Sequence, residues 1–217
     1  MALDSLLRDY VDNCILVRKI AKLFAVVGIS PNFLSVASLV FAVLAGLFFF
    51  FAGNAPRLPF NPILLLAGVF VCLSAFLDGI DGVLAREIGN ANKKGDFLDH
   101  VLDRYSDVFI IVGIILGGYV HPRWEIGVIA IIGVLLSSYM GTQAQAVGLS
   151  RVYGGLIGRA DRLLIIIVAT LLNLIYPYSI PASGLLSFSF LGWTIVIFAV
   201  LCNVTALQRF FYAWKRI

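Results

Sequence analysis

Four aspartates stand at helical spacing near the middle of the chain. Asp78 is followed by Asp81 after three residues, and Asp99 is followed by Asp103 after four. Offsets of three and four place both members of a pair on one face of a helix. Two such faces brought together would form a cage of oxygen atoms, which suits hard cations such as Mg²⁺ or Mn²⁺. Because the spacing also fits a two-metal site that clamps a phosphoryl group, we predict a metal site here.

The composition places these acids in a membrane protein. Hydrophobic residues make up 61% of the 217 residues and charged residues only 13%, and the mean hydropathy is +1.00. A soluble domain is about one quarter charged. The apolar runs follow one another without a polar block long enough for a second fold. We therefore predict one all-α integral membrane domain over residues 1–217, located in the cell membrane.

Six apolar runs come close to the ~20 residues that cross a bilayer as a helix. They cover residues 33–52, 62–77, 97–119, 124–147, 163–176 and 191–206. With the N-terminus in the cytoplasm, only Arg57 and Arg123 fall on the outer side, in agreement with the positive-inside rule. Six transmembrane helices would thus put the aspartates on the cytoplasmic side, between the second and third spans.

The N-terminal residues 1–28 differ from these spans. Between residues 5 and 27, apolar residues recur at helical spacing while charged residues mostly occupy other faces. This pattern is typical of an amphipathic helix that lies at the membrane interface. A signal peptide is the rival interpretation, but acids in the first turns and the lack of a clean small-residue cleavage site argue against it.

The acids have a second interpretation, in which they cap helices or pair with cations at the water boundary. The available partners are Arg86, Lys93, Lys94 and Arg104. We favour a functional site because four acids stand at helical offsets beside glycines that let a ligand approach closely. Ionisable groups at membrane depth are also usually functional.

The segment from Asp78 to Asp103 resembles the signature of the CDP-alcohol phosphatidyltransferase family. The matching residues are Asp78, Asp81, Gly82, Ala85, Arg86, Gly95, Asp99 and Asp103. A match over this many spaced positions is far more specific than a lone glycine-rich loop. The family transfers a phosphoalcohol group from a CDP-linked donor to an acceptor hydroxyl and releases CMP.

The resemblance implies roles for the aspartates and for their neighbours. Asp78, Asp81 and Asp99 match the family's metal ligands, and Asp103 matches the base that also approaches a second metal, so two Mg²⁺ ions are expected, with Mn²⁺ possible. The positions that match CDP-binding residues are Asn32, Ser35, Gly82, Arg86 and Asn92. Ser35 has an alternative role as part of a helix start, because Pro31 and nearby Asn and Ser residues are ordinary capping chemistry.

The acceptor is suggested by residues further along the chain. The Ser138-Tyr139 element, together with Arg159, Arg162 and Arg209, resembles the branch of the family that uses inositol phosphate, in which arginines bind the acceptor phosphate. Gly141 and Gln143 stand where bacterial phosphatidylinositol phosphate synthases carry Lys and Arg, so the pattern is more similar to archaetidylinositol phosphate synthases, which use an ether-lipid donor. Arg159 could equally be a topology signal that reaches the headgroups.

Several alternatives stay open. The acceptor could be glycerol 3-phosphate instead of inositol 1-phosphate, or the donor could be CDP-inositol. A divalent-cation transporter is a remoter possibility, because acids within spans also mark ion pathways.

His100 is interpreted as a boundary residue, because it lacks a second nitrogen or sulfur partner. The resemblance also implies a homodimer, and the basic residues suit lipid headgroups and phosphates better than nucleic acid.

Overall fold

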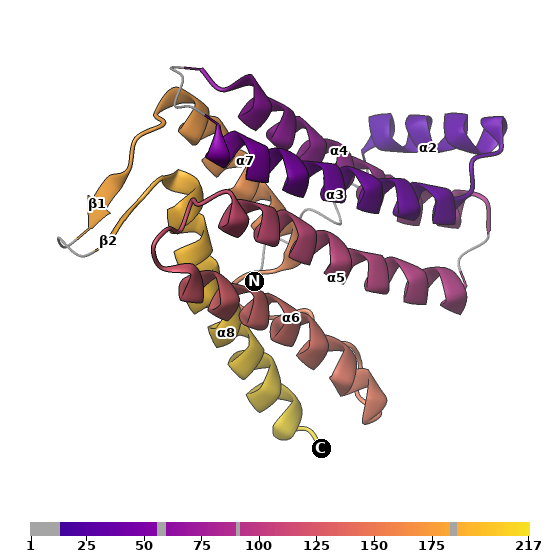
Figure 1. Ribbon diagram of the computed structural model, residues 1–217. Helices are drawn as coiled ribbons and strands as arrows, with labels where there is room; N and C mark the ends of the chain where they lie inside the picture. Colours follow the sequence, from indigo (N-terminus) through magenta and orange to yellow (C-terminus); the bar gives the residue numbers. More distant parts are fainter. Residues whose placement is uncertain (1–13, 56–59, 90–91, 183–185) are drawn as a thin grey trace.

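The computed structural model describes residues 14–55, 60–89, 92–182 and 186–217. Within them the chain forms seven helices and one two-stranded antiparallel hairpin (Figure 1). The helices are α2 (Ile15–Val27), α3 (Pro31–Asn54), α4 (Pro62–Glu87), α5 (Lys93–Leu116), α6 (Trp124–Ala146), α7 (Arg159–Ile175) and α8 (Phe190–Trp214). The hairpin strands, β1 (Ile180–Ala182) and β2 (Leu186–Phe188), join α7 to α8.

The first turns of α3, α4 and α5 are fixed by side-chain caps. Ser30 Oγ accepts a hydrogen bond from the Phe33 amide at 3.2 Å and so caps α3. Asn61 Oδ1 accepts from two amides at 3.1 Å each and caps α4, and Asn92 caps α5 in the same way. Each cap supplies an acceptor for amides that have no partner inside the helix.

Helix α3 is central to the part of the bundle that holds the aspartates, because it packs against both α4 and α5. A Cβ atom at Gly46 of α3 would overlap the carbonyl of Phe109 in α5, and one at Gly113 would overlap the carbonyl of Gly46. The two backbones therefore touch, a packing that small residues permit between membrane helices. Helices α6 and α8 form a second closely packed pair beside them (Figure 1).

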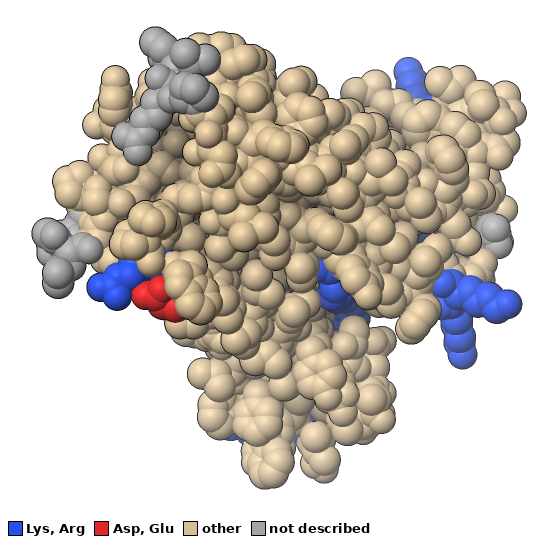
Figure 2. Space-filling model, in the orientation of Figure 1, with Lys and Arg blue, Asp and Glu red and all other residues tan. Residues whose placement is uncertain are grey.

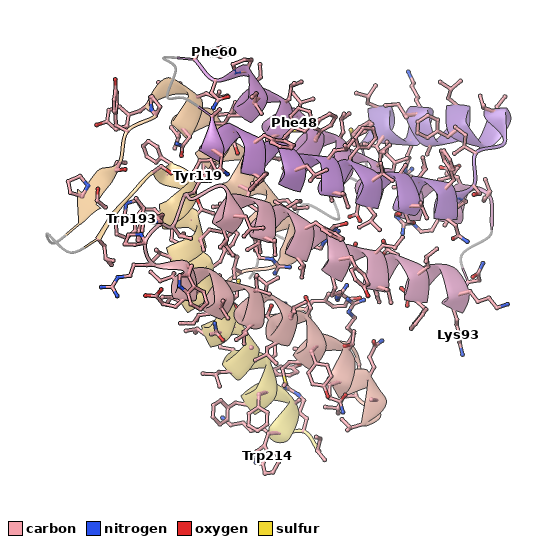
Figure 3. The ribbon with its side chains drawn as sticks, in the orientation of Figure 1. Phe48, Phe60, Lys93, Tyr119, Trp193 and Trp214 are labelled. Carbon is pink, nitrogen blue, oxygen red and sulfur yellow. The ribbon has the colours of Figure 1, made fainter. Side chains whose placement is uncertain are left out.

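The structure has helices that suit a bilayer. Four of them, α3, α4, α6 and α8, are long and apolar enough to cross a membrane. Charged atoms are sparse on the face shown in Figure 2, most of which is neutral. Figure 3 places Lys93 at one end of the bundle, with Tyr119 and Trp193 toward the other. These features, with the family described below, make the chain a membrane protein.

Two of the six expected spans are less clear by length and composition. Helix α7 has 17 residues, and the first turns of α5 carry charged residues, so neither belongs to the four long apolar helices. Helix α2 covers only the second part of the expected N-terminal helix, and residues 5–13 lie outside the described residues, as does Arg57. Six spans and an interfacial N-terminal helix stay predictions.

The structure also adds two features that the sequence analysis lacks. Helix α4 continues past the apolar run 62–77 to Glu87, so Asp78 and Asp81 belong to the same helix as the span. The hairpin is an exception to the expected all-helical chain. It pairs Ile180 with Phe188 and receives a hydrogen bond from Trp193 Nε1 to the Ile180 carbonyl at 3.0 Å.

Candidate active site

The four aspartates meet where the last turns of α4 face the first turns of α5. One carboxylate oxygen from each of Asp78, Asp81 and Asp99 lies within 4.8 Å of the other two. Asp81 and Asp103 are buried, with 6% and 9% of their surface exposed. Asp103 Oδ1 accepts no hydrogen bond from the described residues but lies 2.9 Å from Arg159 Nη1. A set of carboxylate oxygens this close together fits a hard divalent cation.

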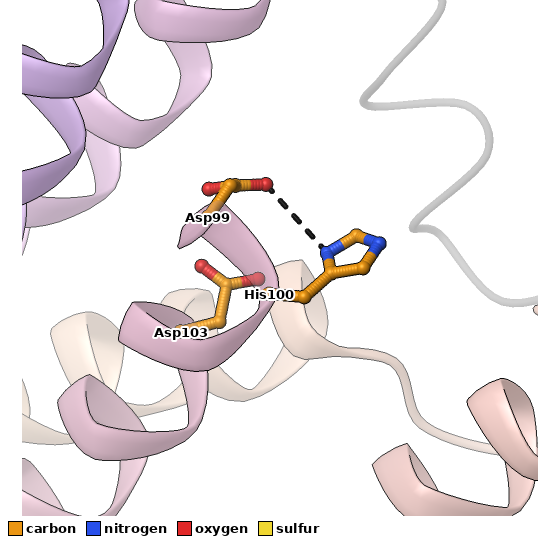
Figure 4. Close-up of side chains that lie close together, drawn as sticks. All are labelled: Asp99, His100 and Asp103. Carbon is orange, nitrogen blue, oxygen red and sulfur yellow. Dashed lines mark ion pairs between the residues drawn. The ribbon is translucent and has the colours of Figure 1, made fainter. Parts of the chain in front are cut away.

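A second group joins the same cluster from the side of α5. Asp99, His100 and Asp103 each offer an atom within 4.8 Å of the others (Figure 4). His100 Nδ1 lies 3.7 Å from Asp99 Oδ2, and His100 Nε2 lies 3.3 Å from Asp96 Oδ1. His100 therefore lies among acids, closer to the candidate site than its interpretation as a boundary residue suggested.

Arg159, at the first position of α7, reaches into the carboxylates. Its Nη1 lies 2.5 Å from Asp78 Oδ2 and 2.9 Å from Asp103 Oδ1, and its Nε lies 3.8 Å from Asp107 Oδ1. Nε and Nη2 are buried and have no hydrogen-bond partner within the described part of the chain. One guanidinium group thus joins three helices and keeps unused donors beside the acids.

The other two arginines expected at the acceptor phosphate, Arg162 and Arg209, are both buried. Arg162 is 3% exposed, and its Nη2 lies 2.5 Å from Oδ2 of the buried Asp107. Arg209 of α8 donates to the carbonyls of Ser137 at 2.6 Å, Gly154 at 2.7 Å and Tyr153 at 3.1 Å. Both guanidinium groups are therefore engaged by the protein, Arg162 with an acid and Arg209 with backbone.

The residues expected to bind CDP lie at the same end of α3, α4 and α5. Ser35 Oγ donates to Asp81 Oδ2 at 2.5 Å, and the cap of α3 is Ser30 and not Ser35. A Cβ atom at Gly95 would lie 3.5 Å from Asn32 Oδ1 and 3.7 Å from Asn92 Oδ1, so the two amide side chains flank that glycine.

Gly82 and Arg86 lie on the last turns of α4. A Cβ atom at Gly82 would lie 3.5 Å from Arg86 Nη1, an ordinary contact distance. The glycine therefore leaves the guanidinium of the exposed Arg86 accessible across the helix surface.

An apolar groove of about 430 Å³ runs between α4 and α7. The α4 residues that line it recur at spacings of three and four from Leu65 to Phe76, so they form one face of the helix. Its wall is almost entirely hydrocarbon, and it suits an aliphatic chain. The lining residues are Leu65, Gly68, Val69, Cys72, Leu73, Phe76, Ile167, Thr170, Leu171 and Leu174.

Comparison with protein families gives one match that spans most of the chain. The family model described as CDP-alcohol phosphatidyltransferase matches residues 28–213. Among curated proteins, an archaetidylinositol phosphate synthase of Pyrococcus horikoshii is 33% identical over 199 residues, which cover 92% of this chain and 91% of that protein.

Solved structures of one relative share the fold. Phosphatidylinositol phosphate synthase of Mycobacterium tuberculosis with CDP-DAG bound is 26% identical, with a TM-score of 0.73 over 92% of this chain and 94% of that one. The same synthase in complex with manganese and citrate also gives a TM-score of 0.73 at 26% identity, over 92% of this chain and 89% of that one.

Proposed function

Since this chain belongs to the CDP-alcohol phosphatidyltransferase family, we propose that it transfers an archaetidyl or phosphatidyl group from a CDP-linked lipid to inositol 1-phosphate. The reaction joins the lipid phosphate to an acceptor hydroxyl and releases CMP. The chain is a transferase of phospholipid biosynthesis, as are the relatives that it matches.

One observation carries the proposal, namely the meeting of acids from two helices at one point. Asp78, Asp81 and Asp99 present oxygens within 4.8 Å of each other, and Asp103 is a buried carboxylate one turn after Asp99. Transfer of a phosphoryl group from a pyrophosphate requires charge neutralisation at the leaving group and a proton acceptor at the attacking hydroxyl. The carboxylates would hold the cation that neutralises this charge, and one of them can accept the proton.

A divalent metal is the cofactor that the carboxylates fit. Asp78, Asp81 and Asp99 would hold it, and Asp103 would share in binding a second ion; we propose two Mg²⁺ ions, which Mn²⁺ can replace. Bound there, the metal would neutralise the charge of the donor pyrophosphate. The manganese complex of the mycobacterial synthase supports divalent-metal dependence.

The residues around the metal site have separate proposed roles in catalysis and in donor binding. Asp103 accepts the proton of the attacking hydroxyl, because it is the acid outside the Asp78, Asp81 and Asp99 ligand set and it matches the family's base. Ser35 orients Asp81 through its 2.5 Å hydrogen bond. The other donor-binding residues are proposed to be Asn32, Gly82, Arg86 and Asn92, with Ser35 adjoining them, and the groove between α4 and α7 takes a hydrocarbon tail.

Inositol 1-phosphate is proposed as acceptor because the relatives are an archaetidylinositol phosphate synthase and a phosphatidylinositol phosphate synthase. Arg159 is the best placed of the three expected arginines, since its Nε and Nη2 make no hydrogen bond within the described chain while Nη1 contacts Asp78 and Asp103. Arg162 and Arg209 complete the set that the family resemblance implied. Their contacts with Asp107 and with backbone carbonyls make an indirect, positioning role the simpler proposal for both.

The membrane arrangement follows the same reasoning. We propose a single domain of six spans, with α5 and α7 added to the four long apolar helices because both pack within the same bundle. The carboxylates then face the cytoplasm of a cell-membrane protein, and residues 1–28 lie along the membrane surface. A homodimer is proposed from the family alone.

The test is CMP release by purified protein with Mg²⁺ and a CDP-lipid, ether-linked or ester-linked. Inositol 1-phosphate, glycerol 3-phosphate, free inositol and serine are offered separately. Release with inositol 1-phosphate alone supports the proposal. Release with glycerol 3-phosphate alone would support the same reaction with a different acceptor. If CMP is released with none of the acceptors on either lipid, the proposal that a CDP-lipid is the donor would be contradicted.

A further inference from the structure

Asp107 is a buried acid of α5 to which the proposed reaction assigns no role. It follows Asp103 by four residues, so the two carboxylates lie on one face of α5. Only 4% of Asp107 is exposed, and an ionised carboxylate at this depth is costly unless it is paired. The partners of Asp107 therefore indicate what it does.

The two oxygens of Asp107 face two arginines of α7. Oδ2 accepts a hydrogen bond from Arg162 Nη2 at 2.5 Å, and Oδ1 lies 3.8 Å from Arg159 Nε. Arg159 and Arg162 are three positions apart, so their side chains lie on one face of α7. One buried carboxylate is therefore shared between two cations, and the hydrogen bond to Arg162 fixes its orientation.

Arg159 lies between Asp107 and the carboxylates of the candidate metal site. Its Nη1 is 2.5 Å from Asp78 Oδ2 and 2.9 Å from Asp103 Oδ1, while its Nε faces Asp107. Of these three acids, Asp107 alone lies outside the proposed metal site. With Asp78 and Asp103 engaged in metal binding, Asp107 is the carboxylate left to balance the charge of Arg159.

Long side chains make the connection between α5 and α7. Within the described residues, α7 packs mainly against α4 and α8. The ion pairs of Arg159 and Arg162 with acids of α5 thus connect two helices that are not close packing partners. An arginine side chain loses much rotamer freedom when it is fixed. Arg159 therefore needs contacts at both edges of its guanidinium to keep one position.

We propose that Asp107 is a positioning residue for Arg159. Its charge at the Nε edge holds the guanidinium in place beside Asp78 and Asp103, and Arg162 keeps the Asp107 carboxylate oriented for this task. The inference rests on the proposed function and deepens it by adding a residue that contacts neither substrate nor metal. Asp107 would act on the reaction only through Arg159.

The test is a double-mutant cycle between Asp107→Asn and Arg159→Gln. Asp107→Asn keeps the shape of the side chain and removes its charge. It should lower kcat/KM for inositol 1-phosphate, measured by CMP release, about 10-fold to 100-fold, because misplacing a group by about 1 Å can cost on the order of 10²-fold. In Arg159→Gln protein the same change should cost less than about twofold, since the residue that Asp107 positions is already gone.

Asp161→Asn is the matched control. Asp161 is 6% exposed and lies on the first turn of α7. Its Oδ2 accepts a hydrogen bond from the Gly158 amide at 2.6 Å, and an asparagine oxygen can keep that bond. The change in kcat/KM caused by Asp161→Asn should therefore be the same in wild-type and in Arg159→Gln protein.

A merely structural role of Asp107 would act through Arg162, and a second variant separates the two roles. Asp107→Leu with Arg162→Met removes both members of the buried pair and should melt near the wild-type temperature. Its kcat/KM should nevertheless stay about tenfold or more below wild type. Adding Arg159→Gln to this variant should lower kcat/KM by less than about twofold.

Melting temperatures of the four proteins in the cycle between Asp107→Asn and Arg159→Gln give a readout without turnover, in which the two changes should be non-additive. The inference is overturned if the two changes act independently on kcat/KM, or if stable Asp107→Leu with Arg162→Met turns over as fast as wild type. Lack of CMP release by the wild-type protein would overturn the proposed function instead. The melting temperatures would then still test whether Asp107 holds Arg159.

Discussion

The hydroxyl of Ser35 donates a hydrogen bond to Oδ2 of Asp81 over 2.5 Å, which joins the start of α3 to the last turns of α4. Both residues are buried, with 6% of each exposed. Because Ser35 bonds to Oδ2, the other carboxylate oxygen of Asp81, Oδ1, is the one proposed to bind the metal. A hydroxyl that orients a metal ligand in this way is part of the binding site, although it does not contact the ion.

Ser35→Ala should weaken metal binding by about 10-fold to 100-fold, because it removes a hydrogen bond that orients a ligand. The measurement is the Mg²⁺ concentration that gives half-maximal CMP release, together with direct titration of Mn²⁺. Ser38→Ala is the matched control: Ser38 is equally buried in α3, and it donates to the Ser74 carbonyl at 2.9 Å, away from the acids. Equal metal affinity in the two variants would remove Ser35 from the site.

Asp103→Asn should abolish turnover while the protein stays folded and binds the CDP-lipid. The amide cannot accept the proton of the attacking hydroxyl, and general base catalysis typically contributes about 10²–10⁴-fold. CMP release and binding of the CDP-lipid are measured on the same preparation. The control is Asp96→Asn, also in α5, whose side chain is 71% exposed. Undiminished turnover of Asp103→Asn would mean that another group is the base.

Arg162→Ala should destabilise the fold, because it leaves Asp107 as a buried charge without its partner at 2.5 Å. Breaking a buried pair costs about 3–5 kcal/mol, whereas replacing both members by apolar residues is often neutral. The double variant Asp107→Leu with Arg162→Met should therefore recover much of the loss in thermal or denaturant unfolding.

The comparison pair for Arg162 lies on the surface. Arg123 and Glu125 are 3.3 Å apart with side chains 51% and 47% exposed, so Arg123→Ala should cost at most about 1 kcal/mol. A similar loss for Arg123→Ala and Arg162→Ala would show that burial does not govern the Arg162 pair. A selective rise in acceptor KM in stable Arg162→Ala protein would favour direct phosphate binding by Arg162.

The proposed topology can be tested by thiol labelling. In a variant without the native Cys14, Cys72 and Cys202, a cysteine is introduced by Lys94→Cys or by Arg123→Cys. A membrane-impermeant reagent should label Arg123→Cys in intact cells and Lys94→Cys only after permeabilisation, because the six-span arrangement puts them on opposite sides. Labelling of both from outside would contradict a cytoplasmic active site.

The spacing of the acids was enough to predict much of the site. Because α4 and α5 are regular helices, offsets of three and four residues put each aspartate pair on one face. The turn between the two helices then brings Asp78, Asp81 and Asp99 within 4.8 Å. The long apolar runs likewise predicted the positions of α3, α4, α6 and α8, since about 20 apolar residues are needed to cross a membrane as a helix.

Contacts between distant parts of the chain could not be predicted in this way. Arg159 and Asp78 are 81 positions apart, and nothing in either helix alone shows that they meet. Arg209 was predicted to bind phosphate, and its hydrogen bonds to backbone carbonyls could not be predicted because carbonyls carry no sequence signal. The contact of Arg151 with His100 likewise depends on the path of the segment 147–158 across α5 and α6.

The central claim is transfer of the lipid phosphate to an inositol phosphate, and the most direct measurement follows both products of one reaction. Purified protein receives CDP-archaeol, or its ester analogue, with inositol 1-phosphate. CMP is quantified by chromatography and the lipid by mass spectrometry. We predict equimolar CMP and inositol-phosphate lipid, both lost on metal chelation and restored by Mg²⁺. CMP release without the lipid product, or product formation that is unaffected by chelation, would contradict the proposed function.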